Sequence, residues 1–194
     1  MPEGAGVAVP PTPPLSPRRH TARWAAVTAA VILVLFVAIL ATRRSAESKL
    51  ADSPLLGHGA PAVAGTSVFG GGVSLSQFQG KWVLVNFLAS WCVPCRQEHP
   101  ELVKFSQRHG QDGQILGVIY DDSSGNVRAF FSELGGDWPV IGDPDGRIAL
   151  DYGVRGPPES FLISPRGLVL TKFTGQVSAD EVDRLIVRYA AAGV

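Results

Sequence analysis

The sequence predicts an α/β domain in which helices flank a central mixed sheet, preceded by one transmembrane helix. Between residues 82 and 134, two apolar runs typical of buried strands each precede an amphipathic stretch, which indicates parallel strands joined by a right-handed crossover. Near the C-terminus, two further strand-like runs flank a tight turn and predict an antiparallel hairpin. An uncharged apolar run near the N-terminus predicts the transmembrane helix.

The composition of the chain excludes one class of function. Its 194 residues include 17 Lys and Arg against 17 Asp and Glu, so the chain lacks the basic excess that attracts nucleic-acid phosphates. We therefore expect no nucleic-acid partner. The two cysteines are too few for the disulfide framework of a small secreted domain or for an all-Cys zinc site.

The N-terminal third of the chain divides into three predicted segments. Residues 1–23 are expected to be a disordered Pro-rich tail. Residues 24–41 carry no charge, and 18 residues of helix span roughly 27 Å, close to the thickness of a bilayer core. We predict an uncleaved signal-anchor, because the run is longer than the apolar region of a cleaved signal peptide. Residues 42–61 are then a linker, and residues 62–194 form the globular domain.

Local patterns predict the elements of that domain. Residues 82–88 form a nearly continuous apolar run, typical of a central strand covered on both faces. Residues 93–109 mix apolar and charged side chains and predict an amphipathic helix, kinked at Pro100. A second buried strand is expected over residues 114–120 and a helix over residues 126–134.

The remaining elements are a hairpin and a last helix. Residues 159–163 and 168–174 are strand-like, and the Pro and Gly between them fit a tight turn. Ser178, followed three residues later by Glu181, is a capping-box sequence that opens a C-terminal helix.

The two cysteines lie where the first buried strand ends and the following helix begins. A thiolate at Cys92 would face the free N–H groups and positive dipole of that helix, which lowers the pKa of a thiol. Cys95 lies one turn further on, within disulfide reach. We therefore predict that Cys92 is a nucleophile and that Cys95 resolves the mixed disulfide that Cys92 forms.

Two other interpretations of the pair are weaker. A merely stabilising disulfide is disfavoured, because a loop closed over two residues removes little entropy from the unfolded chain. A metal site could draw on His58, His99 or His109, but Glu98 beside a cysteine would give an unusual mixture of hard and soft ligands. The Cys-x-x-Cys spacing between a strand and a helix therefore indicates redox chemistry.

Three segments add a resemblance to a known family. They are residues 80–87 (GKWVLVNF), residues 91–96 (WCVPCR) with Glu98 and Pro100, and residues 153–163 (GVRGPPESFLI). Over about residues 60–190 the chain resembles the thioredoxin superfamily. More narrowly, it resembles the membrane-anchored thiol-disulfide reductases of cytochrome c maturation, the CcmG/DsbE and ResA/TlpA group. The resemblance implies a thioredoxin-like fold.

The resemblance also implies the surface that receives the substrate. It makes Pro158 the cis-proline that packs opposite the active-site disulfide and leaves a backbone edge for an incoming peptide. The residues alone allow a cis bond at either Pro157 or Pro158. Trp91, Pro94, Pro158 and Glu159 are the expected substrate-binding residues.

The handling of protons is expected to differ from that of ordinary thioredoxins. Asn86 stands six residues before Cys92, where those proteins carry a buried Asp. The resemblance implies acidic residues at Glu98 and Glu159, and either could raise the pKa of Cys95 or accept its proton. The alternative for Glu98 is a solvated residue that favours the helix dipole.

These inferences predict a bacterial cytoplasmic-membrane protein with its catalytic domain on the extracytoplasmic side. The resemblance implies that it reduces the disulfide of apocytochrome c and that a membrane donor of the CcdA/DsbD kind re-reduces it. One Cys pair cannot reduce itself, so a donor is required. The redox-active Cys92/Cys95 disulfide needs no further cofactor. The alternatives are a general disulfide oxidant, or a non-catalytic copper or zinc carrier that uses Cys92, Cys95 and His99.

Overall fold

The computed structural model describes residues 19–41 and 49–194. The chain divides into two units, Met1–Ser45 and Ala46–Val194, which are described separately. The predicted Pro-rich tail lies outside the described residues up to residue 18. The first part of the predicted linker, residues 42–48, lies outside them as well.

The described part of the first unit is a single helix, α1 (Arg19–Ala41). The helix predicted over residues 24–41 is therefore present. Within it, the Thr28 hydroxyl donates a hydrogen bond to the carbonyl of Trp24, one turn earlier (3.0 Å). Among the described residues, no helix has both the length and the apolarity needed to cross a membrane.

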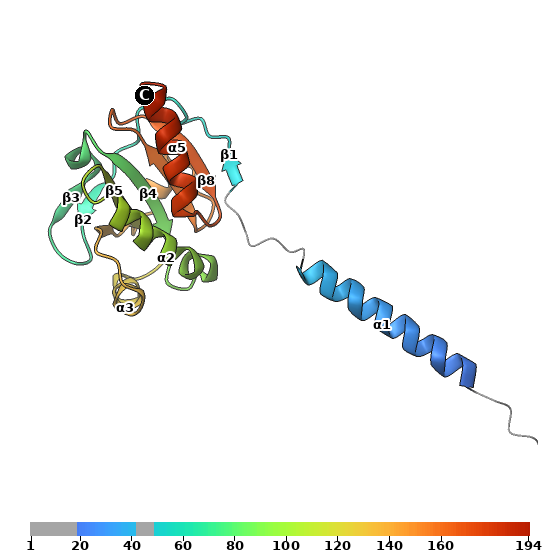
Figure 1. Cartoon of the computed structure of the whole chain (residues 1–194). Helices are drawn as coiled ribbons and strands as arrows, with labels where there is room; N and C mark the ends of the chain where they lie inside the picture. Colours follow the sequence, from blue (N-terminus) through green and yellow to red (C-terminus); the bar gives the residue numbers. More distant parts are fainter. Residues whose placement is uncertain (1–18, 42–48) are drawn as a thin grey trace, which may run out of the picture. The chain divides into compact units, whose positions relative to one another are not determined.

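A six-stranded mixed sheet forms the centre of the second unit (Figure 1). The sheet is mixed, as the sequence predicts, because its central strand pairs in parallel with one neighbour and antiparallel with the other. In order across the sheet, the strands are β1 (Lys49–Ala51), β8 (Val169–Thr174), β7 (Glu159–Ile163), β4 (Trp82–Leu88), β5 (Gly113–Ile119) and β6 (Val140–Ile141). The predicted hairpin is formed by β7 and β8, which are antiparallel.

The helices cover both faces of this sheet, which explains why every residue of β4 is buried. On one face, α2 (Val93–Arg108), α3 (Ser124–Leu134) and α5 (Ala179–Ala191) pack over alternate residues of β4, including Leu84 and Leu88. On the other face, α4 (Arg147–Asp151) and the residues after it pack over Phe87. Successive strand residues point to opposite faces, so the sheet separates two cores. Pro100 lies inside α2.

Short elements that the sequence analysis did not anticipate complete the unit. They are the hairpin of β2 (Ala64–Thr66) and β3 (Gly72–Ser74), the 3-10 helix η1 (Leu75–Phe78), α4 and β6.

Residues 49–61 belong to the folded unit, which differs from the predicted linker. β1 pairs with β8 at the edge of the sheet. The N–H of Gly57 donates to the carbonyl of Val169 (2.8 Å), and the N–H of Ala60 donates to the carbonyl of Gly167 (2.9 Å). Leu55 and its neighbour Leu56 pack against the core on the α4 side. Strand pairing, backbone hydrogen bonds and the two leucines together dock this polar, Gly- and Pro-containing stretch on the domain.

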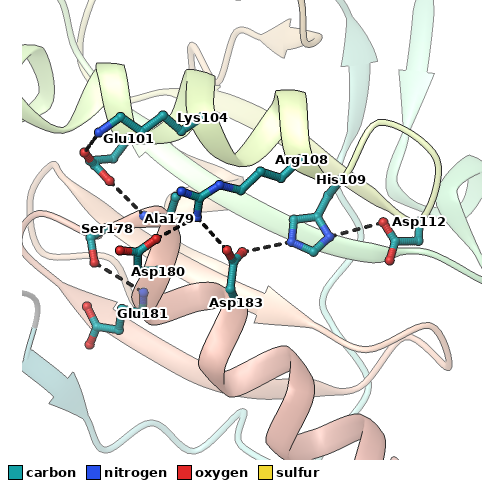
Figure 2. Close-up of polar contacts among 10 residues, drawn as sticks. All are labelled: Glu101, Lys104, Arg108, His109, Asp112, Ser178, Ala179, Asp180, Glu181 and Asp183. Carbon is teal, nitrogen blue, oxygen red and sulfur yellow. Dashed lines mark hydrogen bonds and ion pairs between the residues drawn. The ribbon is translucent and has the colours of Figure 1, made fainter.

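A polar network joins the exposed edges of α2 and α5 (Figure 2). Arg108 of α2 forms ion pairs with Asp180 (2.6 Å) and Asp183 (2.7 Å) of α5. The predicted cap is present, because the Ser178 hydroxyl accepts the N–H of Glu181 (3.3 Å). The two ion pairs hold the start of α5 against α2.

Candidate active site

The two cysteines form a disulfide at the start of α2, with their Cα atoms 5.2 Å apart. Cys92 is the N-cap residue of the helix, and its Sγ accepts the N–H of Cys95 (3.1 Å). Pro94 lies in the first turn. Both cysteines are buried, at 3% and 2% exposure. The Cys92 sulfur therefore lies in the helix-terminal environment that stabilises a thiolate, as the sequence analysis predicts.

The loop before Cys92 is fastened to the loop that follows β5. The N–H of Ser90 donates to Oδ2 of Asp122 (2.7 Å), and the Trp91 indole N–H donates to the carbonyl of Asp121 (3.0 Å). Burial acts to raise the pKa of Asp122, but hydrogen bonds from Ser90 and Asn126 hold it below its ordinary value. Trp91 remains 56% exposed beside the disulfide. The sequence analysis did not identify this pair of aspartates.

Glu98 is buried one turn beyond Cys95, at 2% exposure. Its Oε1 accepts a hydrogen bond from Asn86 Nδ2 (2.9 Å), and its Oε2 accepts the N–H of Val177 (3.1 Å). Burial raises the pKa of Glu98 to about 7, and these two hydrogen bonds partly oppose the rise. The solvated alternative for Glu98 is therefore wrong, because tertiary packing covers this face of α2.

The Asn86 side chain connects Glu98 to the neighbouring strand β7. Its side-chain nitrogen also donates to the hydroxyl of Ser160 (2.9 Å), the residue directly opposite it on β7. All three side chains are buried. Ser160 is a part of the site that the sequence analysis did not identify, and its place in the matched segment 153–163 was the available signal.

Pro158 and Glu159 lie at the start of β7. The peptide bond between Pro157 and Pro158 is cis, which resolves the choice between the two prolines. The Pro158 carbonyl accepts the N–H of Gly175 (3.0 Å). Glu159 is buried, and its carboxylate forms an ion pair with Lys172 (2.8 Å). Because Glu159 and Ser160 point to opposite faces of the sheet, Glu159 does not join Glu98.

The histidines considered as metal ligands lie in three different environments. His99 is buried against Phe130, Phe131 and Trp138, with Nε2 2.8 Å from the carbonyl of Gly135. Burial lowers its pKa. The remaining two are His109, which lies between Asp112 and Asp183, and His58, which contacts its own loop at Leu56. No group of three His, Cys, Asp or Glu side chains suited to a metal occurs in residues 19–41 or 49–194.

Comparisons of the sequence with known proteins find a matching family model and named relatives. The family model described as Redoxin matches residues 56–186. The chain is 40% identical over 109 residues to the thiol:disulfide interchange protein HelX of Rhodobacter capsulatus, a match that covers 55% of this chain and 60% of HelX. It is 38% identical over 133 residues to a DsbE homologue of Paracoccus denitrificans, covering 66% and 72% of the two chains.

A solved structure supports the same fold. The thiol:disulfide interchange protein of the thioredoxin family from Chlorobium tepidum TLS superposes with a TM-score of 0.63 at 27% identity. The superposition covers 71% of this chain and 98% of that chain. The predicted thioredoxin-like α/β fold of the globular domain is therefore confirmed.

Proposed function

The chain belongs to the Redoxin family of thiol:disulfide oxidoreductases, and from this premise we propose that it reduces disulfides of other proteins through Cys92 and Cys95. One observation carries the proposal. The two sulfurs lie at the N-terminus of α2, and a buried carboxylate lies one turn further along the same helix.

The reaction would transfer two electrons and two protons to the substrate. The Cys92 thiolate attacks one sulfur of the substrate disulfide, and the other sulfur leaves as a thiolate that takes a proton from solvent. The Cys95 thiol passes its proton to the Glu98 carboxylate. The Cys95 thiolate then attacks Cys92 Sγ, which releases the second substrate sulfur and leaves Cys92 and Cys95 oxidised. The released sulfur takes up the remaining proton, from Glu98 or from solvent.

Glu98 is suited to this role by its position and its titration range. Residues three apart on a helix lie on the same side of it, so Glu98 and Cys95 are neighbours on α2. With a pKa of about 7, Glu98 is present at neutral pH in both its proton-accepting and its proton-donating form.

The substrate and the donor are proposed from sequence features. Residues 153–163 resemble the pattern of the cytochrome c maturation reductases, which supports the disulfide of apocytochrome c as the substrate. The exposed Trp91, with Pro94 and Pro158, would form the docking surface. The uncharged run 24–41 supports anchoring in the bacterial cytoplasmic membrane, with the domain outside. A membrane donor of the CcdA/DsbD kind would then regenerate the dithiol.

Covalent trapping tests the order of attack. Full-length Cys95→Ser, mixed with oxidised apocytochrome c, should accumulate a disulfide-linked complex that is visible on non-reducing gels and collapses with added thiol. Cys92→Ser should trap no substrate and reduce none. Trapping by Cys92→Ser alone would show that Cys95 is the attacking sulfur. Reduction of the substrate by both variants would contradict a redox role for the pair.

The reduction potential tests the direction of electron flow. A value near that of thioredoxin, about −270 mV, supports a reductase. A value near that of DsbA, about −120 mV, would instead make the protein a disulfide oxidant.

A reporter enzyme tests the location. A reporter that is active only outside the cytoplasm, fused after Val194, should be active. A reporter signal confined to the cytoplasm would contradict the proposed placement.

A further inference from the structure

We propose that Ser160 is a positioning residue for Glu98, because its hydroxyl holds the Asn86 amide with the N–H groups turned toward the Glu98 carboxylate. Ser160 does not touch the sulfur chemistry, and it acts on Glu98 through Asn86. The inference rests on the proposed function in one respect, namely that Glu98 accepts the proton of Cys95.

The hydrogen bonds of Asn86 fix the direction of its side chain. A primary amide nitrogen has two hydrogens to donate. Asn86 Nδ2 donates one to Oε1 of Glu98 (2.9 Å) and the other to Oγ of Ser160 (2.9 Å). Because Asn86 and Ser160 face each other across β4 and β7, the sheet register itself brings the two groups together. The amide nitrogen, rather than its oxygen, therefore faces the carboxylate.

The opposite orientation of the amide would favour a different state of Glu98. It would place Oδ1 of Asn86 against Oε1 of Glu98, and two acceptors in contact repel each other unless the acid is protonated. In the observed orientation the hydrogen bond favours the charged carboxylate. Without the Ser160 hydroxyl, one hydrogen of Nδ2 would lack an acceptor in a buried site, which is costly. The observed orientation of the amide, and with it the charged form of Glu98, would then be less favoured.

The other polar and charged groups near Glu98 do not mask an effect of Ser160 on its pKa. From the elements packed on α2, the polar groups that contact Glu98 are Asn86 of β4 and the N–H of Val177 in the loop before α5, and neither titrates. The charged pair Glu159 and Lys172 projects from the opposite face of the sheet. On α2 itself, Cys95 is in the disulfide and His99 contacts the carbonyl of Gly135. Ser160 therefore acts on a carboxylate that has no ion-pair partner among these groups.

Carboxyl-carbon NMR of the oxidised full-length protein measures the effect directly, since cysteines in a disulfide do not titrate. The resonance of Glu98 is identified by its absence in Glu98→Gln. The wild-type midpoint should lie near 7. Ser160→Ala should raise it by about one pKa unit, the scale that corresponds to the net contribution of one hydrogen bond. Ser160→Thr, which keeps a hydroxyl, should retain the wild-type midpoint.

Two controls separate this effect from a loss of packing. Ser160→Val has the shape of Ser160→Thr without the hydroxyl, so this pair decides the question even if Ser160→Ala does not fold. Ser164→Ala removes another buried hydroxyl of the same hairpin, which accepts the N–H of Leu168 (3.2 Å), and should leave the Glu98 midpoint unchanged. A wild-type midpoint in both Ser160→Ala and Ser160→Val, or equal shifts in Ser160→Val and Ser160→Thr, would overturn the proposal.

A kinetic readout links the shift to the reaction. Reduced protein is mixed with an aromatic disulfide whose two thiolates are coloured, so that the second release reports resolution by Cys95. If the Glu98 midpoint moves from 7 to 8, its ionised fraction at pH 7 falls about fivefold. The second release in Ser160→Ala should slow by that factor at pH 7 and recover at pH 9. Slowing that persists at pH 9 would contradict a positioning role. If Glu98→Gln kept the wild-type pH profile, the proton step of the proposed function would fail, while the NMR midpoints would still decide the role of Ser160.

Discussion

Two buried carboxylates lie on opposite faces of the sheet, close to where β4 ends and β7 begins. They are held by different kinds of partner. Glu98 accepts hydrogen bonds from two neutral donors, the Asn86 amide and the Val177 N–H. Glu159 is paired with the ammonium of Lys172, which also donates to the carbonyl of Gly153 (2.9 Å). Each carboxylate is more than nine-tenths buried.

The difference assigns different roles to the two acids. Neutral donors offset the cost of burial only in part, so Glu98 has a pKa of about 7 and can exchange a proton at neutral pH. Glu159 instead balances the charge of the buried Lys172 ammonium, and removing one partner of a buried ion pair is costly. The difference supports the proposed proton-transfer role of Glu98 and favours a structural role for Glu159, both of which the sequence analysis named as candidates for handling the Cys95 proton.

The largest expected effect comes from breaking the ion pair. Lys172→Met should lower the free energy of unfolding by about 3–5 kcal/mol, because it leaves the Glu159 charge buried and unpaired. Urea unfolding of the oxidised protein measures this change. The double variant Lys172→Met/Glu159→Gln removes both charges and should regain much of the loss. A single variant that loses less than about 1 kcal/mol would show that Glu159 does not depend on Lys172.

Removing the Glu98 carboxylate should raise the free energy of unfolding rather than lower it. The pKa of Glu98 is raised in the folded protein, from 4.5 to about 7, so its contribution to stability is present below pH 4.5 and is lost as the pH rises through about 7. A glutamine does not ionise, so the stability of Glu98→Gln has no such loss. Relative to the wild type, the variant should therefore gain up to about 3 kcal/mol between pH 4.5 and pH 8. Urea unfolding at the two pH values checks the gain, and parallel pH dependences of the two proteins would contradict it.

The smallest effect is expected from the exposed network of Figure 2. Arg108 forms two ion pairs with α5, but its side chain is 45% exposed to solvent. Exposed ion pairs contribute little and are screened by salt. Arg108→Ala should therefore move the urea midpoint less than either buried change, and less again at high salt. A shift as large as that of Lys172→Met would remove the distinction between buried and exposed charges.

The parts of the fold and site that the sequence predicts are those with local signals. The strand-to-helix position of Cys92 and Cys95 follows from an apolar run that ends just before them, and the β7–β8 hairpin follows from its turn residues. Asn86 was identified through the family resemblance, because it stands where ordinary thioredoxins carry a buried Asp.

The features that the sequence analysis did not predict depend on contacts between distant segments. The hydrogen bond from Asn86 to Ser160 joins residues 74 apart, and the bond from Val177 to Glu98 joins residues 79 apart. The burial of Glu98 depends on the loop before α5, and the docking of residues 49–61 depends on β8. Neither leaves a periodic pattern in the sequence.

The proton role of Glu98 is tested most directly by the pH dependence of the second thiolate release in wild type, Glu98→Gln and Glu159→Gln. In the wild type this rate should rise with pH through about 7, as Glu98 becomes able to accept the Cys95 proton. Glu98→Gln should lose that rise and react slowly at neutral pH, whereas Glu159→Gln should keep it. If Glu98→Gln kept the rise and Glu159→Gln lost it, the roles assigned to the two carboxylates would be reversed.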